Sequence, residues 1–119
     1  MTQKRPRVKR GDVILVLYPD SNLRTAKTRP ALILQADNLQ TGLSQVIVAM
    51  ITSRMFRADH QSRVTVLLSS LEGKSSGLLT DSVVMTDNIA TIADTEIDRV
   101  IGSLPMAIID VALRHTLNL

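Results

Sequence analysis

The sequence predicts a small, mainly β protein that ends in an α-helix. Several short apolar segments are separated by turn-forming residues, which is the pattern of a small barrel or sandwich. The final segment changes to helical spacing, with apolar residues on one face at positions 106, 109, 113 and 117. The chain has 119 residues and no cysteine, so we expect one domain that is held by an apolar core and has no disulfide.

Four strands are expected in the first part of the chain. Turn-forming residues follow the first of them, and the uninterrupted apolar character of the third indicates burial on both faces. The fourth alternates between apolar and polar residues, as a half-buried strand does. The four segments are residues 12–17, 30–36, 46–51 and 63–68.

Two further short strands and the helix are expected in the rest of the chain. Residues 81–85 and 89–92 are strand-like, and a small, polar connection at residues 69–77 precedes them. Residues 94–104 fit either a helical stripe or an edge strand. Pro105 suits the first turn of the final helix, and Asp110 and Arg114 have the spacing of an i,i+4 ion pair on it.

The charge is moderately positive and lies mainly in the first half of the chain. There are 14 lysine and arginine residues against 11 acidic ones, and the net charge of +3 favours an anionic partner. Residues 1–9 are expected to be a basic N-terminal arm in front of a single domain at residues 10–119. Aromatic residues make up only 2% of the chain, which argues against an aromatic platform for stacked bases. Nucleic-acid contacts would then depend on arginine, lysine and polar side chains.

Several classes of chemistry find no support in the sequence. The glycines are too scattered for a nucleotide-binding loop, and no serine lies in a G-x-S-x-G elbow. His60 and His115 are not at metal-ligand spacing, and each is interpreted as a solvated or helix-end side chain, so no metal and no cofactor is expected. No apolar run approaches the ~20 residues of a membrane-spanning helix or forms a signal peptide, so a cytoplasmic protein is expected.

Five segments, taken in their order and spacing, resemble one protein family. They are residues 10–13 (RGDV), 28–34 (TRPALIL), 48–53 (VAMITS), 81–84 (DSVV) followed by Asp87, and 101–104 (IGSL). Together they resemble the MazF/PemK-like toxins of bacterial type II toxin–antitoxin systems, over about residues 10–119. The resemblance implies an SH3-like small β-barrel with a C-terminal helix, the plasmid toxin fold of CcdB and MazF.

The resemblance also implies a function. Such toxins are metal-independent endoribonucleases, or mRNA interferases, that cleave single-stranded RNA at a short motif and so inhibit growth. They are usually homodimers, and an acidic antitoxin normally occupies the RNA groove. In this reaction the neighbouring 2′-OH attacks the phosphorus. The site must therefore deprotonate that hydroxyl, protonate the leaving 5′-oxygen and stabilise the charged phosphoryl oxygens.

Three residues match the family's catalytic positions. Arg29 lies in the R-P motif, where its guanidinium could stabilise charge on the phosphate, since arginine stays protonated and is no simple general base. Thr52 lies in the I-T-S motif, where its hydroxyl could donate to a phosphate oxygen or only cap its own backbone. Asp87 could take the 2′-OH proton if its pKa were raised, or could only form a turn with Asn88. The expected RNA-binding residues are Arg24, Lys27, Thr28, Ser53 and Arg54.

The chain also departs from the family pattern. Met85 and Ala90 stand where some members carry arginines, which lowers the positive charge of the expected groove. Leu23 and Arg24 stand where some relatives have a His-Glu pair, which removes one candidate base. Arg24, Lys27 or Arg54 could compensate for the lost positive charge.

Two other functions fit part of the pattern. A protein of the same fold could be catalytically silent, or could bind a protein target as the gyrase-poisoning CcdB toxins do. Those toxins have an aromatic, Trp-containing C-terminal tip, however, and this chain has no tryptophan. A DNA-binding regulator is suggested by the basic N-terminus, but the final helix carries an apolar stripe and a single arginine, unlike a recognition helix.

Overall fold

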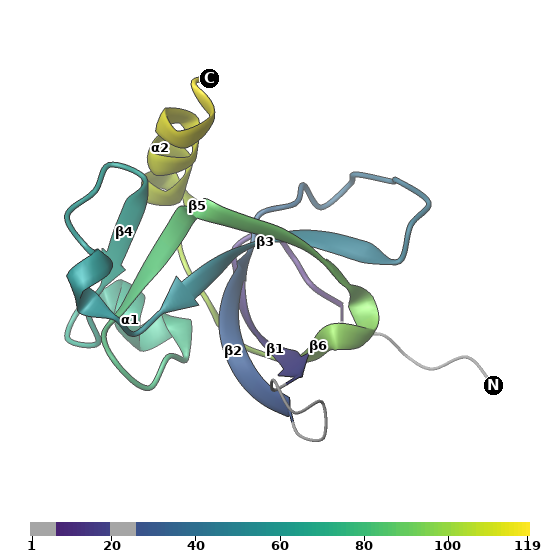
Figure 1. The fold of residues 1–119 in the computed structure, drawn as a ribbon, viewed down its shortest axis with the longest axis horizontal. Helices are drawn as coiled ribbons and strands as arrows, with labels where there is room; N and C mark the ends of the chain where they lie inside the picture. The colour runs from purple at the N-terminus through teal and green to yellow at the C-terminus, as the bar shows by residue number, and fades with distance from the viewer. Residues whose placement is uncertain (1–6, 20–25) are drawn as a thin grey trace.

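The computed structural model describes residues 7–19 and 26–119, and these residues form the predicted mainly β fold with a C-terminal helix. The strands are β1 (Asp12–Pro19), β2 (Ala26–Ile33), β3 (Gln45–Thr52), β4 (Arg63–Val66), β5 (Ser82–Ala93) and β6 (Ile97–Ser103), and the α-helices are α1 (Leu71–Ser76) and α2 (Met106–Leu117). All strand pairs are antiparallel, in the order β4-β5-β3-β2-β1-β6. Figure 1 shows a strongly curved sheet in which the long strand β5 arches across one side.

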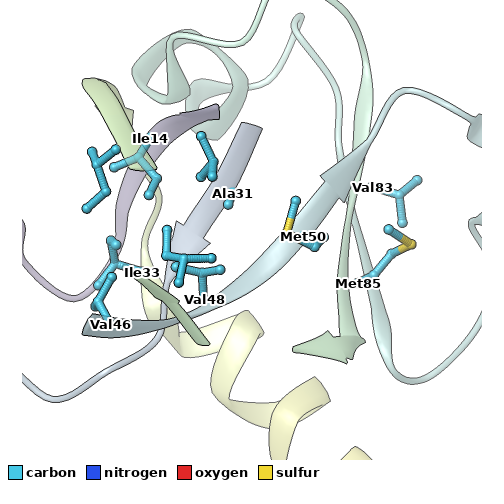
Figure 2. Close-up of a cluster of buried hydrophobic side chains, with 11 residues drawn as sticks. Ile14, Ala31, Ile33, Val46, Val48, Met50, Val83 and Met85 are labelled. Carbon is cyan, nitrogen blue, oxygen red and sulfur yellow. The ribbon is translucent and has the colours of Figure 1, made fainter. Parts of the chain in front are cut away.

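The sheet has a hydrophobic core on each of its two faces. One core, drawn in Figure 2, contains Val48 and Met50 of β3. The other contains Ala49 and Ile51 of the same strand together with Ile109 of α2. Successive residues of β3 therefore face opposite cores, because side chains alternate along a strand. This confirms the expected burial of β3 on both faces.

The polar connection expected at residues 69–77 contains a helix, α1. Its first turn is capped by Ser70, whose side chain accepts a hydrogen bond from the Gly73 N–H (3.0 Å). It ends at Gly77, which adopts the left-handed conformation (φ +73°). A six-residue helix of mostly small, polar residues has no apolar stripe, so the small, polar composition of this connection did not predict it.

The two strands expected at residues 81–85 and 89–92 are one strand, β5, interrupted by a bulge. Met50 of β3 pairs with Met85, whereas the preceding Ala49 pairs with Ile89. Residues 86–88 are therefore extra residues without partners on β3. The turn-like Asp87-Asn88 sequence marks this bulge and not a reversal of the chain.

The C-terminal part of the chain decides between helix and strand for residues 94–104 and shows where the final helix begins. Residues 97–103 form the edge strand β6, after a short 3-10 helix, η2 (Asp94–Glu96), so the strand alternative for this segment is confirmed. The helix α2 begins after Pro105 as expected, and Ile109 on its apolar face is buried. Asp110 pairs with Arg10 (2.5 Å) instead of Arg114, because Arg10 is held beside α2 by a bond from its Nε to the Leu34 carbonyl (2.9 Å). No helix of the described residues is long and apolar enough to cross a membrane.

Glycines let α1 approach β6 closely. A Cβ at Gly77 would lie 2.0 Å from the carbonyl oxygen of Ile101, and a Cβ at Gly102 would lie 2.4 Å from the carbonyl oxygen of Ser75. The Ser75 hydroxyl also donates to the Ser103 carbonyl (3.1 Å). This packing fixes the segment that follows α1 against the last strand of the sheet.

Candidate active site

A surface pocket of about 440 Å³ lies among β2, β3, β6 and the segment that follows α1. Its lining combines apolar side chains, such as Leu78 and Ile101, with hydroxyl groups and three arginines, Arg29, Arg54 and Arg99. Among the described residues that line it there is no carboxylate and no imidazole. The pocket is therefore cationic and suited to an anion.

Arg29 of β2 and Thr52 of β3 meet in this pocket. The two strands pair Ala31 with Met50, and the same register continued for two residues places Arg29 level with Thr52. Both residues line the pocket. Two of the three expected catalytic residues are thus brought together.

The arginines of the pocket have little pairing with carboxylates in the described parts of the chain. Within residues 7–19 and 26–119, no carboxylate pairs with Arg29 or Arg54, and Arg29 is exposed. Among the same residues, the ion pair of Arg99 is a long contact with Asp98 (3.8 Å). Guanidinium groups present rigid forks of donors that match the oxygens of a phosphate. Three of them around one pocket favour a phosphate group there.

Thr52 caps its own backbone, which is one of its two expected roles. Its Oγ1 accepts a hydrogen bond from the backbone N–H of Arg54 (3.1 Å), so it caps the turn after β3. A hydroxyl group that accepts one bond still has its own proton to donate. The cap therefore orients the hydroxyl and leaves its proton available to a phosphoryl oxygen in the pocket.

The expected RNA-binding residues are only partly gathered at the pocket. Thr28, Ser53 and Arg54 line it. Lys27 is exposed on β2, next to Thr28, but does not line the pocket. Arg24 lies outside the described residues, as do residues 1–6 of the expected basic arm.

Asp87 lies away from this pocket, in the β5 bulge. Thr52 pairs with Val83 of β5, whereas Asp87 is four residues further along, in the bulge, and does not line the pocket. Its carboxylate accepts two hydrogen bonds from the Arg63 guanidinium of β4, at 2.9 and 3.4 Å. The bond from Arg63 lowers the pKa of Asp87 below its ordinary value of 3.8. A carboxylate with a lowered pKa is a weaker base, so this geometry does not favour the proton-accepting role expected for Asp87.

Comparison with known proteins places this chain in a family. A family model described as a PemK-like, MazF-like toxin of type II toxin–antitoxin systems matches residues 9–117. The chain belongs to this toxin family. Over 107 residues, it is 33% identical to Endoribonuclease MazF6 of Mycobacterium tuberculosis and equally to Endoribonuclease MazF2 of Mycobacterium bovis. Each alignment covers 87% of this chain and 90% of the relative.

Solved structures confirm the MazF-like fold. The Mycobacterium tuberculosis toxin MazF-mt6 superimposes with a TM-score of 0.69 and 26% identity, covering 91% of this chain and 97% of that one. An endoribonuclease in complex with its cognate antitoxin, from a mycobacterial species, superimposes with a TM-score of 0.70 and 23% identity. That alignment covers 94% of this chain and 96% of the other.

One wall of the pocket in this MazF-like chain was missed by sequence reasoning. Leu79 and Thr80 follow α1, and Arg99 lies on β6. The helix α1 was not expected, and residues 94–104 fitted a helix as well as a strand, so neither segment could be placed beside the motifs. The only sequence signal was the pair of glycines, Gly77 and Gly102, which mark the close approach of α1 to β6.

A positive charge does stand close to Met85, where some MazF relatives carry an arginine. Met85 itself is buried in the first core. Its sulfur is 3.8 Å from Nη1 of Arg57, in the short 3-10 helix η1 (Met55–Arg57) that follows β3. Arg57 therefore supplies a positive charge near Met85 that sequence reasoning did not name.

The two histidines of the MazF-like chain lie in the loop before β4 and at the end of α2. Nδ1 of His60 accepts a hydrogen bond from the Ser62 N–H (3.0 Å), and His115 is exposed in the last turn of α2. No group of three His, Asp or Glu side chains in the described parts of the chain could hold a metal ion.

Replacing Asp87 with asparagine should change stability more than cleavage. The substitution removes the partly exposed ion pair with Arg63, which contributes under about 1 kcal/mol at neutral pH. Because the pKa of Asp87 is lowered in the folded state, this contribution is present above the ordinary pKa of 3.8 and is lost as the pH falls through the lowered value. Urea unfolding of both proteins should therefore show a difference at neutral pH that disappears in strong acid.

The cleavage rate of the same Asp87→Asn variant tests the catalytic alternative. We expect a rate close to that of the wild type at neutral pH, because Asp87 lies outside the pocket. A loss of about 100-fold or more, the effect of removing a general base, would show that Asp87 takes part in catalysis after all.

Proposed function

We propose that this MazF-like toxin is an endoribonuclease that cleaves single-stranded RNA at a short sequence motif, in the pocket lined by Arg29 and Thr52. The observation that carries the proposal is the meeting of these two side chains in a pocket that also holds Arg54 and Arg99. The relatives named Endoribonuclease MazF2 and MazF6 support the same activity. The proposed reaction uses no metal, because guanidinium groups can neutralise the charge on the phosphate.

The proposed reaction takes place at a single phosphate. The 2′-oxygen of a ribose attacks the phosphorus and forms a new P–O bond, while the bond from phosphorus to the 5′-oxygen of the next nucleotide breaks. The 2′-hydroxyl loses a proton and the departing oxygen gains one. The products are a 2′,3′-cyclic phosphate, or the 3′-phosphate that water forms from it, and a 5′-hydroxyl.

Arg29 and Thr52 are proposed to act on the phosphoryl oxygens. Negative charge grows on these oxygens in the transition state, and donors already in place for that charge lower the barrier. Arg29 supplies a charged fork of N–H groups, and the capped hydroxyl of Thr52 supplies one O–H donor. Both act through charge and hydrogen bonding.

The remaining candidates are proposed to bind RNA on either side of the cleaved phosphate. Thr28, Ser53 and Arg54 line the pocket, and Lys27 is exposed next to it. Arg24 and the basic arm at residues 1–9 would add positive charge to the same domain, residues 10–119. Each phosphate contact made by a lysine or arginine should add to the salt dependence of RNA binding.

An acidic antitoxin and a second copy of the chain are the proposed partners. The arginines that would hold phosphate also attract an acidic segment, so an antitoxin should compete with RNA and bind less tightly as salt rises. Ile108 and Val111 of α2 are 59% and 69% exposed, and such an apolar face suits the two-fold contact of a homodimer. The proposed setting is the cytoplasm, where cleavage of mRNA would inhibit growth.

Incubation of the purified protein with single-stranded RNA in excess EDTA tests the proposed function. We expect cleavage at a short recurring motif, with cyclic or 3′-phosphate ends and 5′-hydroxyl ends, because no step of the reaction uses a metal. Sequencing of the fragments would identify the cleaved motif, and end-labelling would identify the chemical groups at the new ends. A strict requirement for magnesium, or 5′-phosphate ends, would contradict the mechanism. Growth arrest without any RNA cleavage would favour the CcdB-like alternative.

A further inference from the structure

We propose that Phe56 stacks against a base of the bound RNA, beside the cleavage pocket. The proposal rests on the proposed endoribonuclease function and adds the side chain that would hold a flanking nucleotide. Phe56 lies in η1, which follows the end of β3 at Thr52. It is one of only two aromatic residues in the chain, so it is a single stacking side chain and not a platform.

The exposure of the Phe56 ring is the first observation. The residue is 78% exposed and is not part of either hydrophobic core formed by the described residues. An apolar ring of this size gains free energy when a partner covers it. No residue of η1 is buried, so the core does not require an aromatic side chain at this position.

The position of Arg57 is the second observation. Its guanidinium carbon lies 5.8 Å from the centroid of the Phe56 ring, which is within the range of a cation–π contact. Arg57 is itself held, because its Nη1 approaches the sulfur of Met85 (3.8 Å) and its carbonyl accepts a bond from Arg63 (3.1 Å). A ring and a guanidinium group are both surfaces on which nucleic-acid bases stack, so the pair presents such a surface from a fixed turn.

The positive charge around Phe56 and its short distance from the pocket favour RNA as the partner that covers the ring. Between residues 53 and 63 there are three arginines, at positions 54, 57 and 63, and one acidic residue, Asp59; of the arginines, Arg63 is paired with Asp87. Arg54 lines the pocket, and two residues of chain span at most about 7 Å, so Phe56 is close to the proposed phosphate site. A strand of RNA with one phosphate in the pocket would therefore bring a neighbouring base to the ring.

Tryptophan fluorescence can test this contact directly, because the chain contains no tryptophan. Phe56→Trp places a single reporter at the proposed stacking position, and Leu119→Trp is the matched control, since Leu119 is 85% exposed and does not line the pocket. The probe is a labelled, mixed-sequence single-stranded RNA with 2′-O-methyl groups, which cannot be cleaved because its 2′-oxygens are blocked. We expect the probe to quench Phe56→Trp and to leave Leu119→Trp unchanged.

Binding affinities separate stacking from simple apolar contact. Phe56→Ala and Phe56→Leu should weaken binding of the probe by about 5- to 100-fold, which corresponds to the loss of one stacked base. Phe56→Tyr should bind nearly as tightly as the wild type, because it keeps a ring. Anisotropy of the labelled probe measures each affinity, and circular dichroism checks that each variant is folded.

The outcomes distinguish this proposal from the proposed function. If the wild type cleaves ordinary RNA but the probe binds Phe56→Trp without quenching, or Phe56→Leu binds as tightly as the wild type, stacking is overturned and the function stands. Failure of the probe to bind also overturns stacking, and cleavage of ordinary RNA then decides the function on its own. A change of oligomeric state in Phe56→Ala, with RNA affinity unchanged, would assign the ring to a protein contact and overturn the proposal.

Discussion

Arg29→Ala is expected to lower the rate of RNA cleavage by about 10²–10³-fold, the scale observed when one preorganised donor to a developing negative charge is removed. Arg29 is exposed and no carboxylate of the described residues pairs with it, so its removal should leave the fold intact. Single-turnover cleavage with enzyme in excess would measure the chemical step, and urea unfolding would confirm that stability is unchanged.

Two further variants show whether charge or geometry is responsible. Arg29→Lys keeps the positive charge but loses the planar fork of donors, so it should recover only part of the lost rate. Arg114→Ala removes the same charge from α2, at a residue that does not line the pocket, and should cleave at nearly the wild-type rate. Full activity in Arg29→Ala, or an equal loss in Arg114→Ala, would remove Arg29 from the mechanism.

Gly77→Ala is expected to cost about 2–5 kcal/mol of the free energy of unfolding. A left-handed backbone conformation costs a non-glycine residue about 1–2 kcal/mol, and Gly77 has a φ of +73°. In addition, the new Cβ would lie 2.0 Å from the Ile101 carbonyl oxygen, and relief of such overpacking typically costs about 1–3 kcal/mol. Because Gly77 also lines the pocket, the shift of α1 away from β6 should slow cleavage as well.

Gly42→Ala is the matched control for the stability measurement. Gly42 has a similar φ of +76°, but a Cβ there would meet nothing within 4 Å. It should therefore show only the backbone cost of about 1–2 kcal/mol. Denaturant unfolding measures the free energy of unfolding of both variants. The difference between their two losses is the cost of disturbing the close approach of α1 to β6. Equal losses in Gly77→Ala and Gly42→Ala would mean that this contact relaxes without cost.

Local apolar patterning predicted most of the strands, and it failed where distant parts of the chain decide the structure. The apolar run of β3 indicated a strand buried on both faces, which is correct. The bulge in β5 depends on where Ala49 and Met50 find their partners, and no local pattern contains that information. The helix α1 depends on its caps, Ser70 and Gly77, and not on periodicity.

The candidate site was predictable to the extent that its residues lie in motifs. The resemblance pointed to Arg29 and Thr52, and the register of β2 against β3 brings them together. Arg99 could not be predicted, because its place in the pocket follows from the pairing of β6 with β1, far apart in sequence. The low aromatic content argued against base stacking in general, but it could not show that the ring of Phe56 is exposed beside the pocket.

The pairing of β6 with β1 also has a consequence for the order in which the protein is made. Strand β1 is among the first parts of the chain to be synthesised, and β6, which contributes Arg99 and Ile101 to the pocket, is among the last. A nascent chain that ends before β6 lacks this wall and leaves one edge of β1 without its partner strand. The ribosome therefore synthesises nearly the whole toxin before the pocket is complete, and a chain that ends before β6 should lack the proposed cleavage activity.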